Sequence, residues 1–456
     1  NFMKRDAFLN NLNNIFDENC IKTDSLNKEK YRNDWSTNYQ SNPIAVVFPK
    51  EKDQVINVIK LCNEFKYPLI GSGGRTGLSG GASATSEELI VSFDKMNSII
   101  DFDENSNTVL CQPGVITENL QSFADENKLY YPVDFSSAGS SQIGGNIATN
   151  AGGIRVLKYG LTSRYVHGLE VITGNASHFC MDKMLVKNAT GPNMQNIFIG
   201  SEGIFGLTVS CRMKLIKKPL DTNVVLIGFD NISSLDKISY QILKYDVEAL
   251  EFFTMKSLLK VKEAFDQVEV EHLKNNYYLI VELHDQKDFS KFLEKIYTEN
   301  LVQEVIISSN STQKQSIWQY RLLISESIAR RSPIKLDVAV PINNISELIK
   351  NLESALKDKK LYDLILFGHL GDGNLHVNIL RQRGDFKFDE KKLIENEVYS
   401  IVSSLRGTFS AEHGIGINKV KAFMSSADII KIDTLKSLKN HFDNNSILNP
   451  GKLIEK

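Results

Sequence analysis

The stretch PLIGSGGRTGLSGGA, residues 68–82, holds six glycines that begin directly after the apolar pair Leu69-Ile70. Such a backbone can take positive φ and turn its N–H groups toward one centre, as a bound pyrophosphate requires. The Rossmann fingerprint is not met, because Thr76 stands where its third glycine is needed, and no Gly-Lys-Ser/Thr triplet completes a P-loop. The stretch therefore predicts a dinucleotide site of another kind. A flexible linker is the alternative, and the flanking strand argues against it.

Two further glycine clusters follow: SSAGSSQIGGNIATNAGG at 136–153 and GSEGIFG at 200–206. Their small and amide residues suit a backbone that approaches a flat ligand, and we expect Asn146, Thr149 and Asn150 to be free to hydrogen-bond it. Nineteen of the 28 glycines lie between Gly71 and Gly206, and none lies between Gly228 and Gly368. This change in composition predicts a domain boundary near residue 218.

Hydrophobic periodicity predicts an α+β chain. The first part reads as a helical preface, a strand at 45–48, a helix that opens at Pro49, a strand at 109–111 and a helix at 117–126 capped by Thr117. After the boundary, strands alternate with helices at 311–329 and 345–356. Several of these strands alternate polar with apolar residues, which favours an antiparallel sheet with one face covered by helices. The strands are expected at 224–227, 247–253, 277–283, 302–307 and 336–340.

The composition excludes several classes of protein. A formal net charge of -2 gives no general attraction to nucleic acid. No apolar run reaches the roughly 18 residues of a membrane span. Five cysteines are scattered singly, which indicates neither a disulfide framework nor a metal cluster and favours a reducing compartment. We expect a cytosolic protein of two or three domains, unless a targeting segment lies outside this sequence.

Polar residues gather in FGHLGDGNLHVN at 367–378 and SAEHGIG at 410–416. Asp372-Gly373 predicts a turn between two strands, which can bring His369 and His376 together. Two imidazoles and the carboxylate of Glu412 form a ligand set for a divalent metal such as zinc, with the neighbouring His413 left as a free base. A packing role is the alternative. The other five histidines are expected to be surface or packing residues: His167, His178, His272, His284 and His441.

These motifs, with Asn449-Pro450-Gly451-Lys452, resemble the flavoprotein family of vanillyl-alcohol-oxidase type, in the branch of D-lactate, D-2-hydroxyglutarate and glycolate dehydrogenases. The resemblance runs from about residue 42 to the end. It implies a two-subdomain FAD-binding domain of PCMH type at 42–218 behind a helical preface at 1–41. It also implies a cap domain with an antiparallel sheet flanked by helices and a metal site at 219–415, and a helical segment at 416–456 that returns to the FAD domain.

The resemblance also implies residue roles. It makes His369, His376 and Glu412 the metal ligands and His413 the catalytic base. It makes Arg321 the residue that grips the substrate carboxylate, with Ser325, Lys335 and Asn378 nearby; for Arg321 and Lys335 the alternative is a solvated charge. Ser325 stands where the family often has threonine. The residues implied in FAD binding are Gly71, Ser72, Gly73, Gly74, Arg75, Thr76, Gly77, Leu78, Ser79, Gly139, Ser140, Ser141, Gly144, Gly145, Asn146, Thr149, Asn150, Ala151, Gly152, Gly153, Gly203 and Asn449.

The implied activity is oxidation of a D-2-hydroxy acid, D-lactate or D-2-hydroxyglutarate, by hydride transfer to FAD and metal-assisted loss of the hydroxyl proton. The first loop has no histidine or cysteine, so we expect non-covalent FAD. Arg330, Arg331 and Lys335 offer charge for a second substrate carboxylate. We also expect a homodimer, a mitochondrial location if the source is eukaryotic, and an electron acceptor that is an electron-transferring flavoprotein, a quinone or a cytochrome.

Three alternatives remain open at this point. One is a flavin-dependent transferase resembling alkyl-dihydroxyacetone-phosphate synthase, which should need a long apolar channel and membrane attachment. Another is a subunit of a glycolate dehydrogenase. The third is a metal-dependent hydrolase that uses only the His/Glu site, which would leave three glycine clusters without a role.

Overall fold

A computed structural model describes residues 2–36, 40–182, 184–284, 287–357 and 361–455. The chain forms two compact units. The first comprises Asn1–Gly152, Leu161–Lys218 and Glu412–Lys456, and the second comprises Gly153–Gly160 and Pro219–Ala411. Among the helices in the described ranges, none is both long and apolar enough to cross a membrane.

The first unit begins with a four-stranded sheet in the order β1 (Ile21–Lys22), β2 (Ala45–Val47), β4 (Leu89–Ser92), β3 (Leu69–Ser72). Strands β2, β4 and β3 are parallel, and α3 (Lys52–Phe65) connects β2 to β3. The helix buries its apolar face, including Val55 and Ile59, against this sheet, and α1 (Phe2–Ile15) contacts α3. The predicted strands before and at the start of the first glycine stretch are therefore present.

The second sheet of this unit is antiparallel, in the order β5 (Ile99–Asp103), β6 (Thr108–Cys111), β10 (Gly206–Lys214), β8 (Val166–Thr173), β9 (His178–Cys180). A short pair joins β11 (Ile216–Lys217) to β7 (Leu129–Tyr130). The other helices of this unit are α2 (Ser25–Glu29), α4 (Thr117–Glu126), α5 (Ile143–Thr149), α7 (Gln195–Phe198), α15 (Val420–Ser426) and the longer α16 (Ile429–Phe442). It also contains the 3-10 turns η1 (Glu18–Cys20), η2 (Phe93–Lys95) and η3 (Thr162–Tyr165).

Helix α4 has the predicted bounds, but the predicted cap is wrong. The N-cap residue is Ile116, and it makes no side-chain cap. Thr117 already lies in the first turn, where its hydroxyl accepts a hydrogen bond from Asn146 Nδ2 (2.6 Å) and lies 2.7 Å from Ser141 Oγ. The hydroxyl therefore ties α4 to the second glycine cluster instead of capping the helix.

The C-terminal segment returns to the first sheet, as the fold class predicts. Leu69 N donates to Ile447 O (2.8 Å), and Asn449 N donates to Leu69 O (2.8 Å). These bonds extend the edge at β3 with residues from far along the chain. The first glycine stretch thus begins beside the end of the protein.

The second unit is built on a seven-stranded sheet in which every pair is antiparallel. The predicted strands are all present, within three residues at their ends, and the hairpin of the His motif adds two more. The order across the sheet is β15 (Glu304–Ile307), β12 (Asn223–Phe229), β14 (Tyr277–Leu283), β13 (Val247–Thr254), β17 (Tyr362–His369), β18 (Asn374–Arg381), β16 (Ile334–Ala339).

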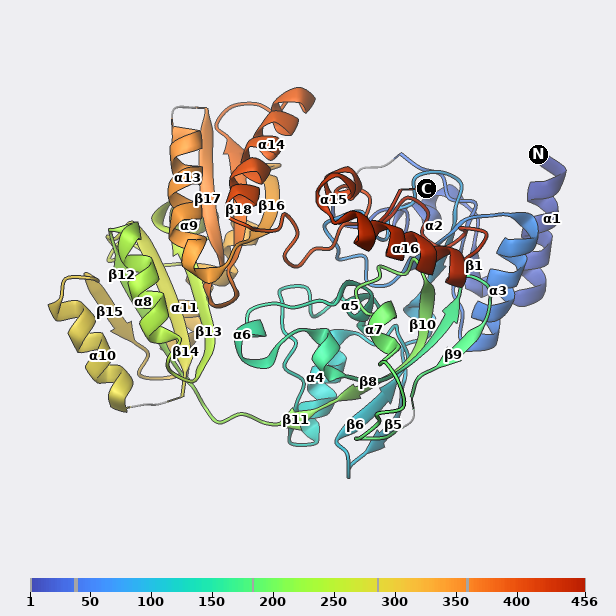
Figure 1. Ribbon diagram of the computed structural model, residues 1–456, viewed down its shortest axis with the longest axis horizontal. Helices are drawn as coiled ribbons and strands as arrows, with labels where there is room; N and C mark the ends of the chain where they lie inside the picture. Colours follow the sequence, from blue (N-terminus) through green and yellow to red (C-terminus); the bar gives the residue numbers. More distant parts are fainter. Residues whose placement is uncertain (1, 37–39, 183, 285–286, 358–360, 456) are drawn as a thin grey trace. The chain divides into compact units, whose positions relative to one another are not determined.

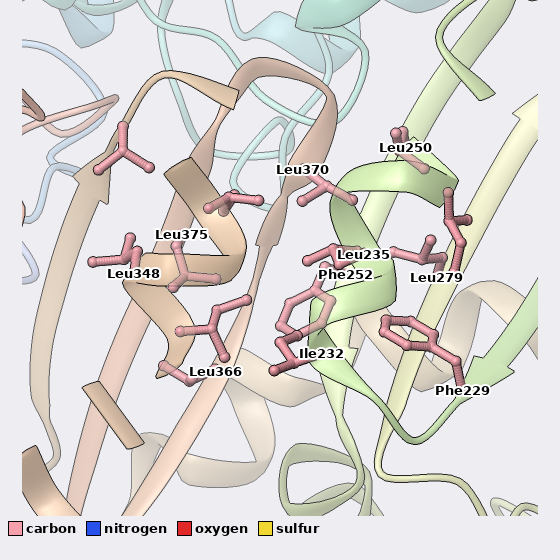
Figure 2. Packing of buried hydrophobic residues seen from close by; sticks show 14 of the residues in the cluster. Phe229, Ile232, Leu235, Leu250, Phe252, Leu279, Leu348, Leu366, Leu370 and Leu375 are labelled. Atoms are coloured by element: carbon pink, nitrogen blue, oxygen red, sulfur yellow. The ribbon is translucent and has the colours of Figure 1, made fainter. Parts of the chain in front are cut away.

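Helices cover both faces of this sheet, so the prediction of one covered face is wrong. One cluster joins the sheet to α8 (Leu235–Ile242), α10 (Lys287–Thr298), α13 (Ile345–Lys357) and α14 (Phe388–Ser404). Figure 2 shows Leu235 of α8 against Phe252 of β13, and α13 lies beside β17 (Figure 1). The central strand β13 is buried along its whole length, which requires cover on each side.

The opposite face packs against α9 (Met255–Ala264), α11 (Ser311–Leu322) and α12 (Ile324–Ala329). The single helix predicted at 311–329 is therefore two helices, which meet at Leu323. The unit also contains α6 (Val156–Tyr159), η4 (Ile232–Ser234), η5 (Ile342–Asn344) and η6 (Leu370–Asp372).

Candidate active site

A row of ionisable side chains crosses four neighbouring strands of the seven-stranded sheet. Glu251 of β13 pairs in register with His369 of β17, and His376 of β18 pairs with Asp337 of β16. His376 also pairs with Phe367, whose ring belongs to the cluster under α9, α11 and α12. Because side chains alternate along a strand, all four ionisable residues lie on this face.

The turn predicted at Asp372-Gly373 connects the two histidine strands. Gly373 has φ +78°, and a Cβ there would lie 2.2 Å from Val340 O, so only glycine fits without strain. Asp372 Oδ1 accepts a hydrogen bond from Asn374 N (3.2 Å). The tight turn brings the Nε2 atoms of His369 and His376 to 3.4 Å.

A carboxylate lies on the far side of each imidazole. Glu251 Oε1 is 2.7 Å from His369 Nδ1, and Asp337 Oδ1 is 3.7 Å from His376 Nδ1. The first contact is a hydrogen bond that places the His369 proton on Nδ1 and leaves the lone pair of Nε2 for a ligand. Sequence reasoning missed Glu251 and Asp337. The available signal was a carboxylate within an apolar strand: Glu248 and Glu251 in VEALEFF, and Asp337 in LDVAV.

Asp337 also binds the backbone of Ala411, the residue directly before Glu412. Its Oδ1 accepts a hydrogen bond from Asn374 Nδ2 (2.8 Å), and its Oδ2 accepts one from Ala411 N (3.1 Å). The chain leaves the second unit directly after Ala411, and Glu412 and His413 are the next residues. Within the described ranges, one atom each of Asp337, His376, Glu412 and His413 lies within 4.8 Å of the others, a possible metal-binding group.

The donor set fits a divalent ion. Two nitrogen ligands at about 2.0–2.1 Å from a tetrahedral ion lie about 3.3–3.4 Å apart, which is the separation expected for imidazole ligands of zinc. The Nε2 atoms of His369 and His376 are 3.4 Å apart, and carboxylates are close by. Of the three predicted ligands, His376 and Glu412 belong to the group of four, while His369 adjoins it through His376. Their assignment as ligands stays a prediction.

Arg321 is not the solvated charge that the alternative supposed. It is buried on α11, and its Nε lies 2.7 Å from Glu251 Oε2, although the angle does not make this ion pair a hydrogen bond. Its guanidinium carbon lies 4.7 Å from the centre of the Phe367 ring, a cation–π contact. One carboxylate thus holds both His369 and Arg321.

The other predicted substrate residues differ in burial and in their distance along the chain from the polar row. Asn378 is buried on β18, and Lys335 lies opposite it in register on β16. Lys335 is exposed as a residue, yet desolvation of its ammonium lowers its pKa. Ser325 is exposed on α12. Arg330 is also exposed, and Arg331 forms a surface ion pair with Glu263 (3.5 Å), so neither charge is gathered into the polar row.

The glycine clusters come together in the first unit. A Cβ on Gly74 would lie 2.2 Å from Ser140 O, and one on Gly73 would touch Gly145 Cα at 3.6 Å, so the first two clusters are packed against each other. Asn449 Oδ1 accepts from Gly71 N (2.9 Å), and its Nδ2 donates to Glu202 O (2.6 Å). Asn449 therefore joins the third cluster to the first.

One glycine of this region faces open space. A Cβ on Gly145 would have no atom within 4 Å, whereas those on Gly74 and Gly144 would clash with the backbone of Ser140 and with Pro113. Close packing on one side and open space beside Gly145 form a cradle for a flat ligand. The residues present therefore fit FAD.

The side chains of Asn146, Thr149 and Asn150 each make a hydrogen bond within the protein, and their contact with FAD stays a prediction. Asn146 Nδ2 donates to Thr117, Thr149 Oγ1 donates to Gly145 O (3.0 Å), and Asn150 Oδ1 accepts from Ser163 N (2.9 Å). These groups fix the shape of the cluster. Of the three, Thr149 bonds the backbone of its own helix, while Asn146 and Asn150 bond residues of other segments.

The carboxylate of Glu202 anchors the segment that follows His413. Its two oxygens accept from Ile415 N and Gly416 N, both at 2.7 Å. Burial raises the pKa of Glu202, and the two backbone donors oppose that shift. Glu202 therefore ties the third glycine cluster to the residues after Glu412 and His413.

Comparisons with known proteins find two family regions in the chain. Residues 43–179 match the family described as an FAD binding domain, and residues 218–453 match the C-terminal domain of FAD linked oxidases. A D-2-hydroxyglutarate dehydrogenase of Stutzerimonas stutzeri is 36% identical over 99% of both chains.

Solved structures show the same fold at low identity. A p-cresol methylhydroxylase has a TM-score of 0.77 at 15% identity and covers 99% of this chain and 97% of its own. An alkyldihydroxyacetonephosphate synthase has a TM-score of 0.71 at 17% identity, with 98% and 84% covered. The predicted α+β fold of PCMH type is confirmed.

Proposed function

The chain belongs to the FAD-linked oxidases, and we propose that it is an FAD-dependent dehydrogenase that oxidises a D-2-hydroxy acid to the 2-oxo acid. The observation that carries the proposal is the gathering of two imidazoles, two carboxylates and Arg321 on one face of the second unit's sheet. A near-full-length relative at 36% identity is a D-2-hydroxyglutarate dehydrogenase, and this supports the same substrate class.

The fold implies FAD, and the donor set implies a divalent ion. These two groups would supply the hydride acceptor and the positive charge that the reaction needs. When bound, FAD supplies a two-electron acceptor for the α-hydrogen, and a divalent ion, proposed as zinc, supplies positive charge that favours loss of the hydroxyl proton. Gly145 and the three glycine clusters would hold the FAD non-covalently. His369, His376 and Glu412 would hold the ion.

The remaining residues bind the substrate and move its proton. Arg321 would bind the carboxylate through its terminal nitrogens, because its Nε faces Glu251. His413 would accept the hydroxyl proton, since imidazole is the side chain most often used as a general base. Asn378 and Lys335, side by side on β18 and β16, would contact the rest of the substrate.

D-2-hydroxyglutarate is the substrate that this arrangement favours over D-lactate. A dicarboxylate needs two cationic partners, and Arg321 and Lys335 can each serve one carboxylate. An electron-transferring flavoprotein, a quinone or a cytochrome would then reoxidise the flavin. The homodimer and the cytosolic or mitochondrial location stay predictions.

The proposal is tested by steady-state turnover of the FAD-loaded protein with an artificial electron acceptor. D- and L-forms of lactate, 2-hydroxyglutarate and glycerate, with achiral glycolate, form the panel, and the 2-oxo acid product is measured. We expect D-2-hydroxyglutarate to give the highest kcat/KM. Absence of any 2-oxo acid product from the D-acids, with FAD and metal both bound, would refute the proposal.

A further inference from the structure

We propose that Glu251 is a positioning residue that prepares the metal site and the substrate site together. Its two carboxylate oxygens are divided between His369 and Arg321, at 2.7 Å each. This inference rests on the proposed function, because it assigns those two residues to metal and substrate. Glu251 would act on the metal ion and the substrate only through these two residues.

The carboxylate of Glu251 is buried, and its two oxygens face His369 and Arg321. The side chain is 0% exposed, in the middle of the fully buried strand β13. A buried carboxylate is costly unless cationic or hydrogen-bonding partners face it. Its two partners come from two other elements: the imidazole of His369 at the end of β17 donates a hydrogen bond, and Arg321 on α11 is cationic.

The contact with His369 determines which nitrogen faces the metal site. A carboxylate that accepts from Nδ1–H fixes the tautomer and orients the ring, and loss of such an outer partner typically costs 10- to 100-fold in metal affinity. In this protein the fixed Nε2 is the atom that lies 3.4 Å from His376 Nε2. Glu251 therefore keeps the lone pair of His369 Nε2 directed toward His376 Nε2.

The contact with Arg321 determines how the guanidinium is presented. Glu251 holds the Nε edge, and the Phe367 ring holds the planar face at 4.7 Å. The terminal nitrogens remain as the group that can take a substrate carboxylate in bidentate geometry. The same carboxylate thus sets the direction of the substrate anchor relative to the metal ligand.

Glu282 provides a matched control on the adjacent strand β14. It is also buried, and it also has two partners, the cations Arg155 at 3.0 Å and Lys314 at 2.8 Å. Its cationic partners lie outside the polar row. A purely structural role for Glu251 would make Glu251→Gln and Glu282→Gln behave alike.

The experiment compares these two variants in the FAD-loaded protein. Zinc affinity is measured by competition with a chromogenic chelator, and KM and kcat are measured with D-2-hydroxyglutarate. We expect Glu251→Gln to weaken zinc binding 10- to 100-fold and to raise KM about 10-fold or more, while Glu282→Gln stays within about twofold in both. Equal losses in the two variants, or zinc affinity within about twofold of the unaltered protein in Glu251→Gln, would overturn the inference.

A second measurement needs no change at Glu251. Nitrogen-15 NMR of the metal-free, unaltered protein, with His369→Gln used to assign the signal, should show His369 protonated at Nδ1 and bare at Nε2. The opposite tautomer would contradict the inference. Both the tautomer and the zinc affinity are read without turnover, so a wrong hydroxy-acid assignment would leave them unchanged and is detected separately by the substrate panel.

Discussion

His369 Nε2 and His376 Nε2 lie 3.4 Å apart, although seven positions of sequence and a change of strand separate the two residues. The hairpin at Asp372-Gly373 produces this approach, and the carboxylates of Glu251 and Asp337 lie behind the two rings. Two imidazoles that face each other at this distance can hold one ion.

Replacing His376 by alanine should remove the metal and leave the flavin. The loss of zinc affinity should exceed the 10- to 100-fold cost of losing an outer partner, because a direct ligand is removed. Elemental analysis and flavin absorbance measure the two contents. His284→Ala is the control, since His284 also contacts a carboxylate, Glu248 at 3.1 Å, away from the polar row. Full zinc content in His376→Ala would exclude His376 as a ligand.

His413→Ala should separate proton transfer from metal binding. If His413 is the general base, kcat should fall about 10²- to 10⁴-fold while zinc and FAD contents stay unchanged. Turnover assays and elemental analysis of the same sample measure this. Loss of zinc together with activity would instead make His413 a ligand, consistent with its place in the group of four.

Gly373→Ala should destabilise the hairpin more than a matched glycine replacement does. The left-handed backbone costs about 1–2 kcal/mol for a residue with a Cβ, and the new Cβ would also meet Val340 O at 2.2 Å. Gly384 has a similar φ of +69° but only Arg381 Nη1 at 3.9 Å, so Gly384→Ala should show the backbone cost alone. Free energies of unfolding measure the difference. Equal losses would show that the turn relaxes and the clash is harmless.

Gly145→Ala should weaken FAD binding without destabilising the protein. No protein atom obstructs the added methyl group, and alanine is favoured over glycine inside a helix by about 0.5–1 kcal/mol. Fluorescence titration of the flavin-free protein with FAD measures the affinity, and its unfolding curve serves as the internal control. Unchanged FAD affinity would mean that Gly145 does not line the flavin site.

Local sequence signals predicted much of the fold and part of the site. Asp372-Gly373 predicted the hairpin because a turn depends on neighbouring residues, and the glycine clusters predicted where the backbone packs closely. Glu251 and Asp337 were missed because their roles depend on strand order: β13 lies beside β17, and β16 beside β18, across long stretches of chain. The hydrogen bonds of Asn146 and Asn150 were missed because their partners, Thr117 and Ser163, lie in other segments of the chain.

The most direct test of the account is anaerobic mixing of the FAD- and zinc-loaded protein with D-2-hydroxyglutarate, followed by flavin absorbance. We predict bleaching of the flavin band by the D-acid, little bleaching by the L-acid, and none by the D-acid after zinc is removed with FAD still bound. Equal bleaching by the two enantiomers, or full bleaching by the D-acid in verified zinc-free protein, would contradict the account.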